Sequence, residues 1–155
     1  MSVHSHIKII LHVIWGTHER ARILHSELRS KLFEHLKSSI SKMKIKSERL
    51  NIQPEHLHLL MELPADRAIA DIVKQLKGES SNWINENNLI AGKFRWARGY
   101  AALSVSVSQM EKVRQYIINQ DQHHHRQTFA EEYCVFLDKY GIEYKAETAE
   151  AVKGV

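Results

Sequence analysis

The chain has 155 residues, with 22 lysines and arginines against 18 aspartates and glutamates, and a net charge of +4 when its 11 histidines are counted as neutral. This length predicts one domain with a buried core, and the 43% apolar and 26% charged residues are typical of soluble globular chains. No apolar run approaches the roughly 20 residues that cross a bilayer. We expect no signal peptide, because the first apolar stretch lacks a basic flank and a cleavage site. The single cysteine, Cys134, excludes an intrachain disulfide and favours a reducing compartment.

The first part of the chain alternates between strand and helix patterns. Residues 6–15 are rich in β-branched and aromatic side chains, which favours a strand. Apolar residues recur every four positions within 24–43, as on one face of an amphipathic helix. Two short strands are predicted over 44–52 and 56–63, with Pro54 in the turn between them.

The middle of the chain continues this alternation. Apolar residues at helical spacing predict a helix over 67–88, and a shorter alternating pattern predicts a strand over 100–107. Ser108 and Glu111 have the spacing of a capping box, which predicts a helix from about residue 109 to the low 120s.

A second capping box lies near the C-terminal end. Thr128 and Glu131 predict the start of a last helix, and Gly141 predicts its end. We therefore expect residues 1–144 to form a single domain and residues 145–155 to form a loose tail.

The order of the first six elements predicts the fold class. Strand, helix, strand, strand, helix, strand is the β-α-β-β-α-β order of ferredoxin-like domains. We predict an α+β fold, with a ferredoxin-like antiparallel sheet that carries two helices on one face. The helix that begins after Ser108 is predicted to cover the other face.

The stretch "PEHLHLLMEL" at 54–63 carries two histidines, His56 and His58, within a predicted strand. Alternate side chains of a strand point to the same face, so the two imidazoles would lie about 7 Å apart and could converge on one divalent ion. In a chain with 11 histidines, a surface or core pair without a metal is the alternative. The run "QHHHRQ" at 122–127 is better explained as a solvated helix end, and H-E-x-x-H and paired C-x-x-C motifs are absent.

A tyrosine and a glutamine lie one turn apart on the helix predicted after Ser108. Tyr116 and Gln120 would flank its apolar stripe and look towards the sheet. A tyrosine hydroxyl, with an ordinary pKa near ~10, is a weak nucleophile at neutral pH, but a metal on the target phosphate would compensate for this. A half-buried tyrosine at a helix border is the alternative interpretation.

Taken together, these features resemble the HUH superfamily of single-strand nucleases. More narrowly, the chain is similar to the one-tyrosine transposases of the insertion-sequence 200/605 type, which include the REP-associated tyrosine transposases. The likeness extends from about residue 6 to 144. It is carried by "LHVIWGTHER" at 11–20, "PEHLHLLMEL" at 54–63, "VKQLKGESSNWIN" at 73–85, "FRWARGYAALSVS" at 94–106 and "VRQYIINQDQHHHRQTFAEEY" at 113–133.

The resemblance implies a role for each residue of the motifs. His56 and His58 are expected to hold Mg²⁺ or Mn²⁺, with Gln120 as the third ligand and His124 as an alternative. Tyr116 is expected to attack single-stranded DNA, forming a 5′-phosphotyrosine and releasing a 3′-hydroxyl that later rejoins a strand. The residue before His56 is a glutamate where aspartate is frequent in the family.

The resemblance also implies partners. We expect a DNA hairpin at the element end, a homodimer whose active site lies in one subunit or across two, no membrane, and a bacterial cytoplasmic location near the nucleoid. Basic and aromatic residues that could contact phosphates and unpaired bases are Arg20, Lys74, Lys77, Lys93, Arg95, Trp96 and Arg98.

Other functions stay open at this stage, because ferredoxin-like sheets host many activities. The chain could be a domesticated relative that nicks and joins repeats without moving itself. It could also be a non-catalytic domain that binds single-stranded DNA or RNA, or a homodimer that stores metal or has a structural role.

Overall fold

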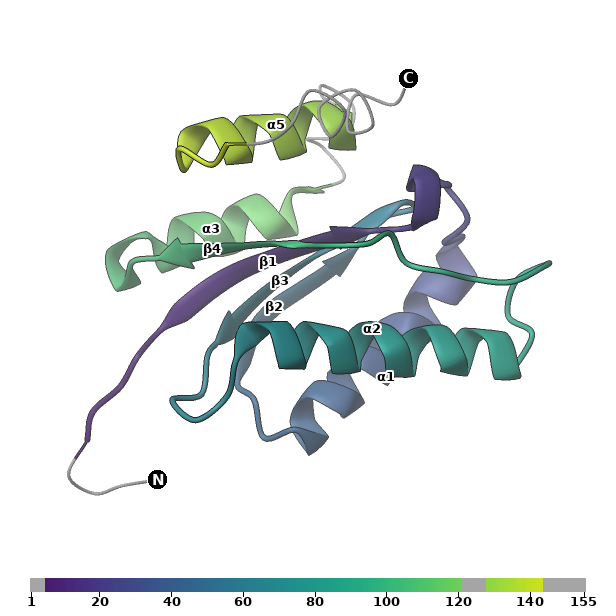
Figure 1. Ribbon diagram of the computed structural model, residues 1–155, viewed down its shortest axis with the longest axis horizontal. Coiled ribbons are helices and arrows are strands. Elements are labelled where there is room, and N and C mark those ends of the chain that lie inside the picture. The colour runs from purple at the N-terminus through teal and green to yellow at the C-terminus, as the bar shows by residue number, and fades with distance from the viewer. Residues whose placement is uncertain (1–4, 121–127, 144–155) are drawn as a thin grey trace.

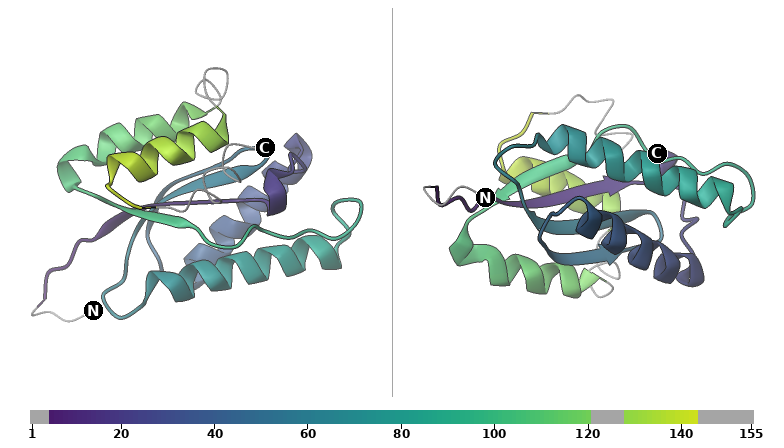
Figure 2. Two further views of the ribbon diagram at one scale, coloured as in Figure 1. Left: turned by 45° about the horizontal axis from the view of Figure 1, so that its top comes forward. Right: turned by 90° about the horizontal axis from the view of Figure 1, so that it is seen from below.

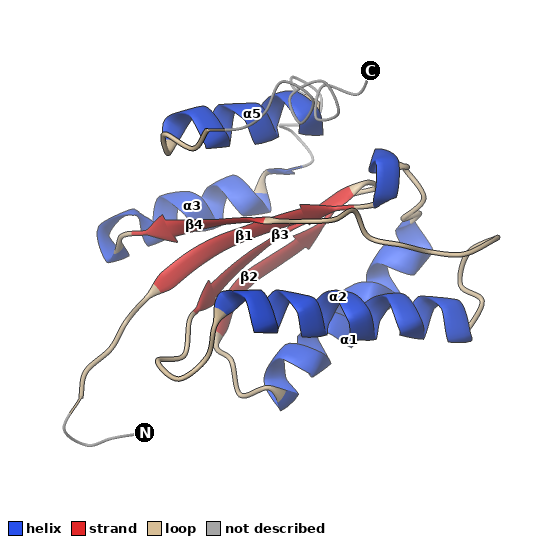
Figure 3. Cartoon of the chain, in the orientation of Figure 1, coloured by secondary structure: helices blue, strands red, loops and turns tan. Residues whose placement is uncertain are grey.

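The computed structural model describes residues 5–120 and 128–143. Its centre is one antiparallel sheet in the order β2-β3-β1-β4 (Figures 1 and 3). The strands are β1 (Ile10–Gly16), β2 (Ser47–Ile52), β3 (His56–Glu62) and β4 (Ala101–Val105).

Helices cover both faces of this sheet (Figures 1 and 2). One face carries α1 (Ser26–Lys42) and α2 (Ile69–Glu86), which are the two crossover helices. The other face carries α3 (Met110–Ile118), the helix that holds the tyrosine, and α5 (Phe129–Lys139). The predicted fold class, a ferredoxin-like sheet with two helices on one face and the tyrosine helix on the other, is confirmed.

The alternation of side chains along the central strands gives the two faces different chemistry. On β3, Leu57, Leu59 and Met61 are at most 1% exposed and join the core beneath α1 and α2. His56 and His58, from the same strand, point to the opposite face. The leucine stripe of α1 fills the apolar side, and each fully buried leucine contributes roughly 1.5–3 kcal/mol to stability. The packing of β3 against α1 and α2 therefore fixes the position of the polar side chains on its other face.

Two of the predicted helix starts have different outcomes. The capping box at Ser108 is wrong: α3 begins at Met110, after a 3₁₀ turn, and no side chain caps it. The Ser108 hydroxyl instead lies 3.1 Å from the Ser106 hydroxyl, a local hydrogen bond that competes with capping. The predicted cap at Thr128 is confirmed, because its Oγ1 accepts a hydrogen bond from the backbone N–H of Glu131.

The described part of the chain contains no helix that is long and apolar enough to cross a membrane. The division at residue 144 stays a prediction, because residues 144–155 lie outside the described residues.

Gly16, the last residue of β1, allows α5 to lie close to the sheet. A Cβ at this position would be 3.0 Å from Cε2 of Phe129 and 3.1 Å from the carbonyl oxygen of Glu55. The missing side chain lets the Phe129 ring stack on the His56 imidazole, with ring centroids 4.0 Å apart and planes 9° from parallel. Gly16 therefore sets how closely the first turn of α5 approaches His56.

We expect Gly16→Ala to lower the free energy of unfolding by about 1–3 kcal/mol, because the added methyl group forces Phe129 and the backbone at Glu55 apart. The measurement is urea denaturation followed by circular dichroism. Gly78→Ala, inside α2 where nothing lies within 4 Å of the added Cβ, is the control and should raise stability by roughly 0.5–1 kcal/mol. An unchanged or raised midpoint for Gly16→Ala would show that α5 does not approach the strand this closely.

Candidate active site

The candidate site lies on the sheet face between α3 and α5. His56 and His58 of β3 are fully buried there. On the neighbouring strand β1, Gly16 pairs with His56 and Ile14 pairs with His58, so His12 follows on the same face. His56 and His58 each have a hydrogen-bond partner at Nδ1, and their Nε2 atoms face Glu132.

His58 is held by a second imidazole. Its Nδ1 lies 2.7 Å from Nε2 of His12, and both rings are buried. Burial, followed by the neighbouring His58, lowers the pKa of His12 to about 3, and burial also lowers the pKa of His58. Both rings are therefore neutral at pH 7 and share one proton between these nitrogens. When His58 donates through Nδ1 to His12, its Nε2 carries a lone pair.

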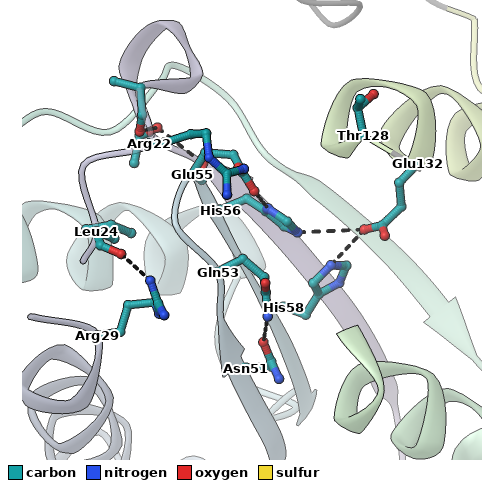
Figure 4. A network of polar contacts seen from close by, with 12 residues as sticks. Arg22, Leu24, Arg29, Asn51, Gln53, Glu55, His56, His58, Thr128 and Glu132 are labelled. Carbon is teal, nitrogen blue, oxygen red and sulfur yellow. Dashed lines mark hydrogen bonds and ion pairs between the residues drawn. The ribbon is translucent and has the colours of Figure 1, made fainter. Parts of the chain in front are cut away.

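His56 is held by a carboxylate (Figure 4). Its Nδ1 lies 2.6 Å from Oε1 of Glu55, and the other oxygen of Glu55 accepts from the Arg22 guanidinium. An ionised carboxylate only accepts hydrogen bonds, so the His56 proton is on Nδ1, while Nε2 faces Glu132 with its Oε1 3.8 Å away. This carboxylate–histidine arrangement is the one that commonly orients metal-binding imidazoles.

Glu132 of α5 meets both imidazoles. Its Oε1 lies 2.8 Å from Nε2 of His58 and 3.8 Å from Nε2 of His56 (Figure 4). Both carboxylate oxygens are buried, and the Tyr116 hydroxyl also lies within reach of the carboxylate. Although burial would raise it, the contact with His58 and the nearby His56 lower the pKa of this carboxyl to about 2. Glu132 is therefore an anion in an enclosed site.

Tyr116 of α3 closes the site from the other side. Its ring centroid lies 6.1 Å from that of His58 and 5.5 Å from that of Phe136. Burial, and then the charge of Glu132, raise the pKa of the Tyr116 hydroxyl. Gln120 is fully buried, and its amide lies beside His58 and Tyr116. The four residues predicted from the sequence to form the centre of the site thus lie together in one chain.

The composition of the site fits a divalent cation. Single ligand atoms of His56, His58 and Glu132 lie within 4.8 Å of one another. A buried anion is costly unless positive charge or hydrogen bonds compensate it, and two imidazoles with one carboxylate are a common ligand set for divalent metals. The Gln120 amide, which lies beside His58 and Tyr116, offers a further oxygen. The alternative ligand His124 lies outside the described residues.

Sequence reasoning missed Glu132, His12 and Glu55 as parts of the site. For Glu132 a signal exists: it lies three residues after Phe129 and four before Phe136, so a carboxylate occupies the stripe that α5 buries. For His12 the missing information was the register of β1 against β3, which places it beside His58.

Four of the predicted DNA-binding residues lie near His56, in the segments that contain Arg20 and residues 93–98. Lys93, Arg95 and Arg98 are exposed, and their loop joins the end of β1, where Ala97 N–H donates to the carbonyl of Gly16. Gly16 pairs with His56, so this loop and the segment with Arg20 and Arg22 lie at the histidine end of the sheet.

The other predicted DNA-binding residues are Trp96, Lys77 and Lys74, and the first two contact other parts of the protein. Trp96 is 8% exposed and its indole N–H donates to the Ser80 hydroxyl, so its ring is occupied by packing. The Lys77 ammonium donates to the carbonyls of Ala97 and Gly99, which ties the loop to α2. Lys74 is exposed on α2, and α2 covers the face of the sheet opposite to that covered by α3 (Figure 1).

We expect Glu132→Gln to weaken Mn²⁺ binding by about tenfold or more, because a charged ligand is replaced by a neutral amide. Gln120→Leu should weaken it less, because it removes a neutral oxygen. Isothermal titration calorimetry without DNA measures both. Equal affinities for wild type and Glu132→Gln would show that the carboxylate does not bind the ion.

Glu55→Gln should reduce Mn²⁺ affinity by roughly 10–100-fold, because the His56 tautomer is no longer fixed. Glu55→Asp keeps a carboxylate and should recover part of this loss. Glu48→Gln is the matched control, since Glu48 pairs with Arg114 away from the histidines. If Glu55→Gln and Glu48→Gln bind Mn²⁺ equally well, Glu55 does not act on the site.

Comparisons with a protein family and with a curated relative both identify transposases as similar proteins. Residues 5–120 match the family described as "Transposase IS200 like". The chain is 27% identical over 114 residues to the ISDra2 transposase TnpA of Deinococcus radiodurans, which covers 70% of this chain and 81% of the relative. The match to the family ends before α5, so Glu132 lies beyond the part of the chain that the family describes.

Two solved structures share the fold. A crystal structure of a transposase from Deinococcus radiodurans R1 superposes with a TM-score of 0.63 at 27% identity, over 77% of this chain and 96% of that one. A REP-associated tyrosine transposase bound to a REP hairpin superposes with a TM-score of 0.60 at 13% identity, over 80% and 74% of the two chains.

Proposed function

Because the chain belongs to the family of IS200-like transposases, we propose that it cleaves and rejoins single-stranded DNA through a 5′-phosphotyrosine on Tyr116. The observation that carries this proposal is the convergence of the Tyr116 phenol with His56, His58 and Glu132 on one face of the sheet. A nucleophile and a set of metal ligands that meet at one point are what attack on a phosphodiester requires.

The chain's own residues supply the geometry of the reaction. His56 and His58 present Nε2, Glu132 presents a carboxylate, and Gln120 adds an amide oxygen. A divalent cation bound there would withdraw charge from the scissile phosphate and fix it for in-line attack. As the bond from the Tyr116 oxygen to phosphorus forms, the bond to the 3′ oxygen breaks; the phenol releases its proton and the departing oxygen takes one up. The bond energy stays in the covalent intermediate, so rejoining needs no nucleotide cofactor.

Basic residues at the histidine end of the sheet would guide the DNA. Arg20, Arg22, Lys93, Arg95 and Arg98 lie in two loops that are joined by backbone hydrogen bonds next to His56. Cations at this place would contact the phosphates of a strand that enters the site. A hairpin as the recognised element is supported by the REP hairpin bound to the structural relative.

We also propose a homodimer that acts on DNA in the bacterial cytoplasm. Apolar side chains remain exposed on the described surface beyond β4 and beyond α5, namely Val107 and Ile142. A second copy could cover part of this surface.

Wild-type protein with Mn²⁺ and labelled single-stranded oligonucleotides from the DNA on either side of the gene should give a covalent adduct on a denaturing gel. Tyr116→Phe should abolish the adduct, because it removes the attacking oxygen. Tyr133→Phe, a half-buried tyrosine on α5, is the matched control and should form the adduct normally.

His56→Ala should reduce adduct formation by about a hundredfold or more while retaining DNA binding in a filter assay. Adduct formation by Tyr116→Phe at the wild-type rate would exclude Tyr116 as the nucleophile. DNA binding by wild type without any adduct would favour a non-catalytic binding domain.

A further inference from the structure

A cleft opens between α3 and α5 above the edge of β4, and Tyr116 and Glu132 form part of its wall. Its volume is about 680 Å³, within the range of roughly 300–1,000 Å³ that small-ligand pockets occupy. Figure 2 shows the two helices side by side over the sheet face that carries the histidines. The cleft is thus a route from solvent to the reactive hydroxyl.

The walls of the cleft combine three kinds of surface. Lys112 of α3 and Lys139 of α5 are exposed on its two sides and give it cations. Val113, Val135 and the ring of Phe136 give it apolar surface. Hydroxyl groups come from Ser104 on β4 and from the turn that follows this strand.

We propose that this cleft binds one unpaired nucleotide of the DNA strand, directly next to the phosphate that Tyr116 attacks. This inference rests on the proposed function and names a part of its substrate. The combination of cations with aromatic and apolar walls is typical of sites for single-stranded nucleic acid, where cations contact phosphates and bases lie against side chains. A cleft of this volume admits one nucleotide but is too small for a duplex.

The position of the charges favours a nucleotide over an apolar peptide or a second copy of the chain. The two lysines stand at the sides of the cleft, whereas the anionic Glu132 lies where the histidines meet it. A nucleotide that places its base between Val113 and Val135 can direct one phosphate towards a lysine and the other towards Tyr116. Unpaired bases would therefore be selected at this position, because a paired base cannot enter.

The test uses thymidine 3′,5′-bisphosphate, a single nucleotide with phosphates on both sides, added to ¹⁵N-labelled full-length protein in Mg²⁺ buffer. We expect saturable shifts of the amide signals of Val113, Val135 and their neighbours. The double variant Lys112→Ala/Lys139→Ala should weaken binding by about fivefold or more. Lys31→Ala/Lys37→Ala, which removes the same charge from α1 on the other face of the sheet, should leave binding unchanged.

A second pair of variants tests the cleft by filling it. Val135 is 53% exposed and lines the cleft, so Val135→Trp should fold normally and weaken bisphosphate binding by about tenfold or more. Glu131→Trp, an exposed neighbour on the same helix that does not line the cleft, should bind as wild type does.

Three results would overturn the inference: no saturable shifts, shifts confined to the loops at 18–22 and 93–98, or equal binding by Val135→Trp and Glu131→Trp. The adduct assay with Tyr116→Phe separates this inference from the proposed function. Adduct formation without binding in the cleft refutes only the cleft, whereas binding in the cleft without an adduct supports the cleft and refutes the nuclease activity.

Discussion

The contact between the Glu132 carboxylate and the imidazoles of β3 is the constraint on which the rest of the site depends. A buried anion has to be compensated by charge or by hydrogen bonds, and among the described residues Glu132 meets His58, His56 and Tyr116. The contact requires α5 to dock on the sheet, and the stack of Phe129 on His56 beside Gly16 fixes how closely it docks. An ion between these groups would satisfy the carboxylate and both ring nitrogens at once.

The division of the sheet into two faces explains how the protein carries so many polar groups in its interior. Leucines of β3 and of α1 form an apolar core on one face, which stabilises the strands without any help from the site. The other face can then hold three histidines, a tyrosine and a carboxylate. Each of the two imidazoles that face Glu132 is oriented by a hydrogen bond at its Nδ1. His12 orients His58, and the Glu55–Arg22 pair orients His56.

The sequence predicted the fold class and the centre of the site because these depend on local patterns. Element order gave the ferredoxin-like sheet, strand alternation put His56 and His58 on one face, and helical spacing put Tyr116 beside Gln120. The partners of these residues depend on tertiary contacts instead. Glu132 reaches the site only through the docking of α5, and His12 only through the pairing of β1 with β3. The cap of α3 was mispredicted for a local reason, since Ser108 bonds to Ser106 rather than to the helix.

The most direct test of the account is a crystal structure of the protein with Mn²⁺, for which an anomalous difference map locates the metal ion. We predict one strong anomalous peak between Nε2 of His56, Nε2 of His58 and the carboxylate of Glu132, at about 2.0–2.2 Å from each ligand atom, with the Tyr116 hydroxyl facing it. A map with no peak at this place, or with Mn²⁺ bound only by other residues, would contradict the claim that the sheet and the two helices together form a metal-dependent catalytic centre.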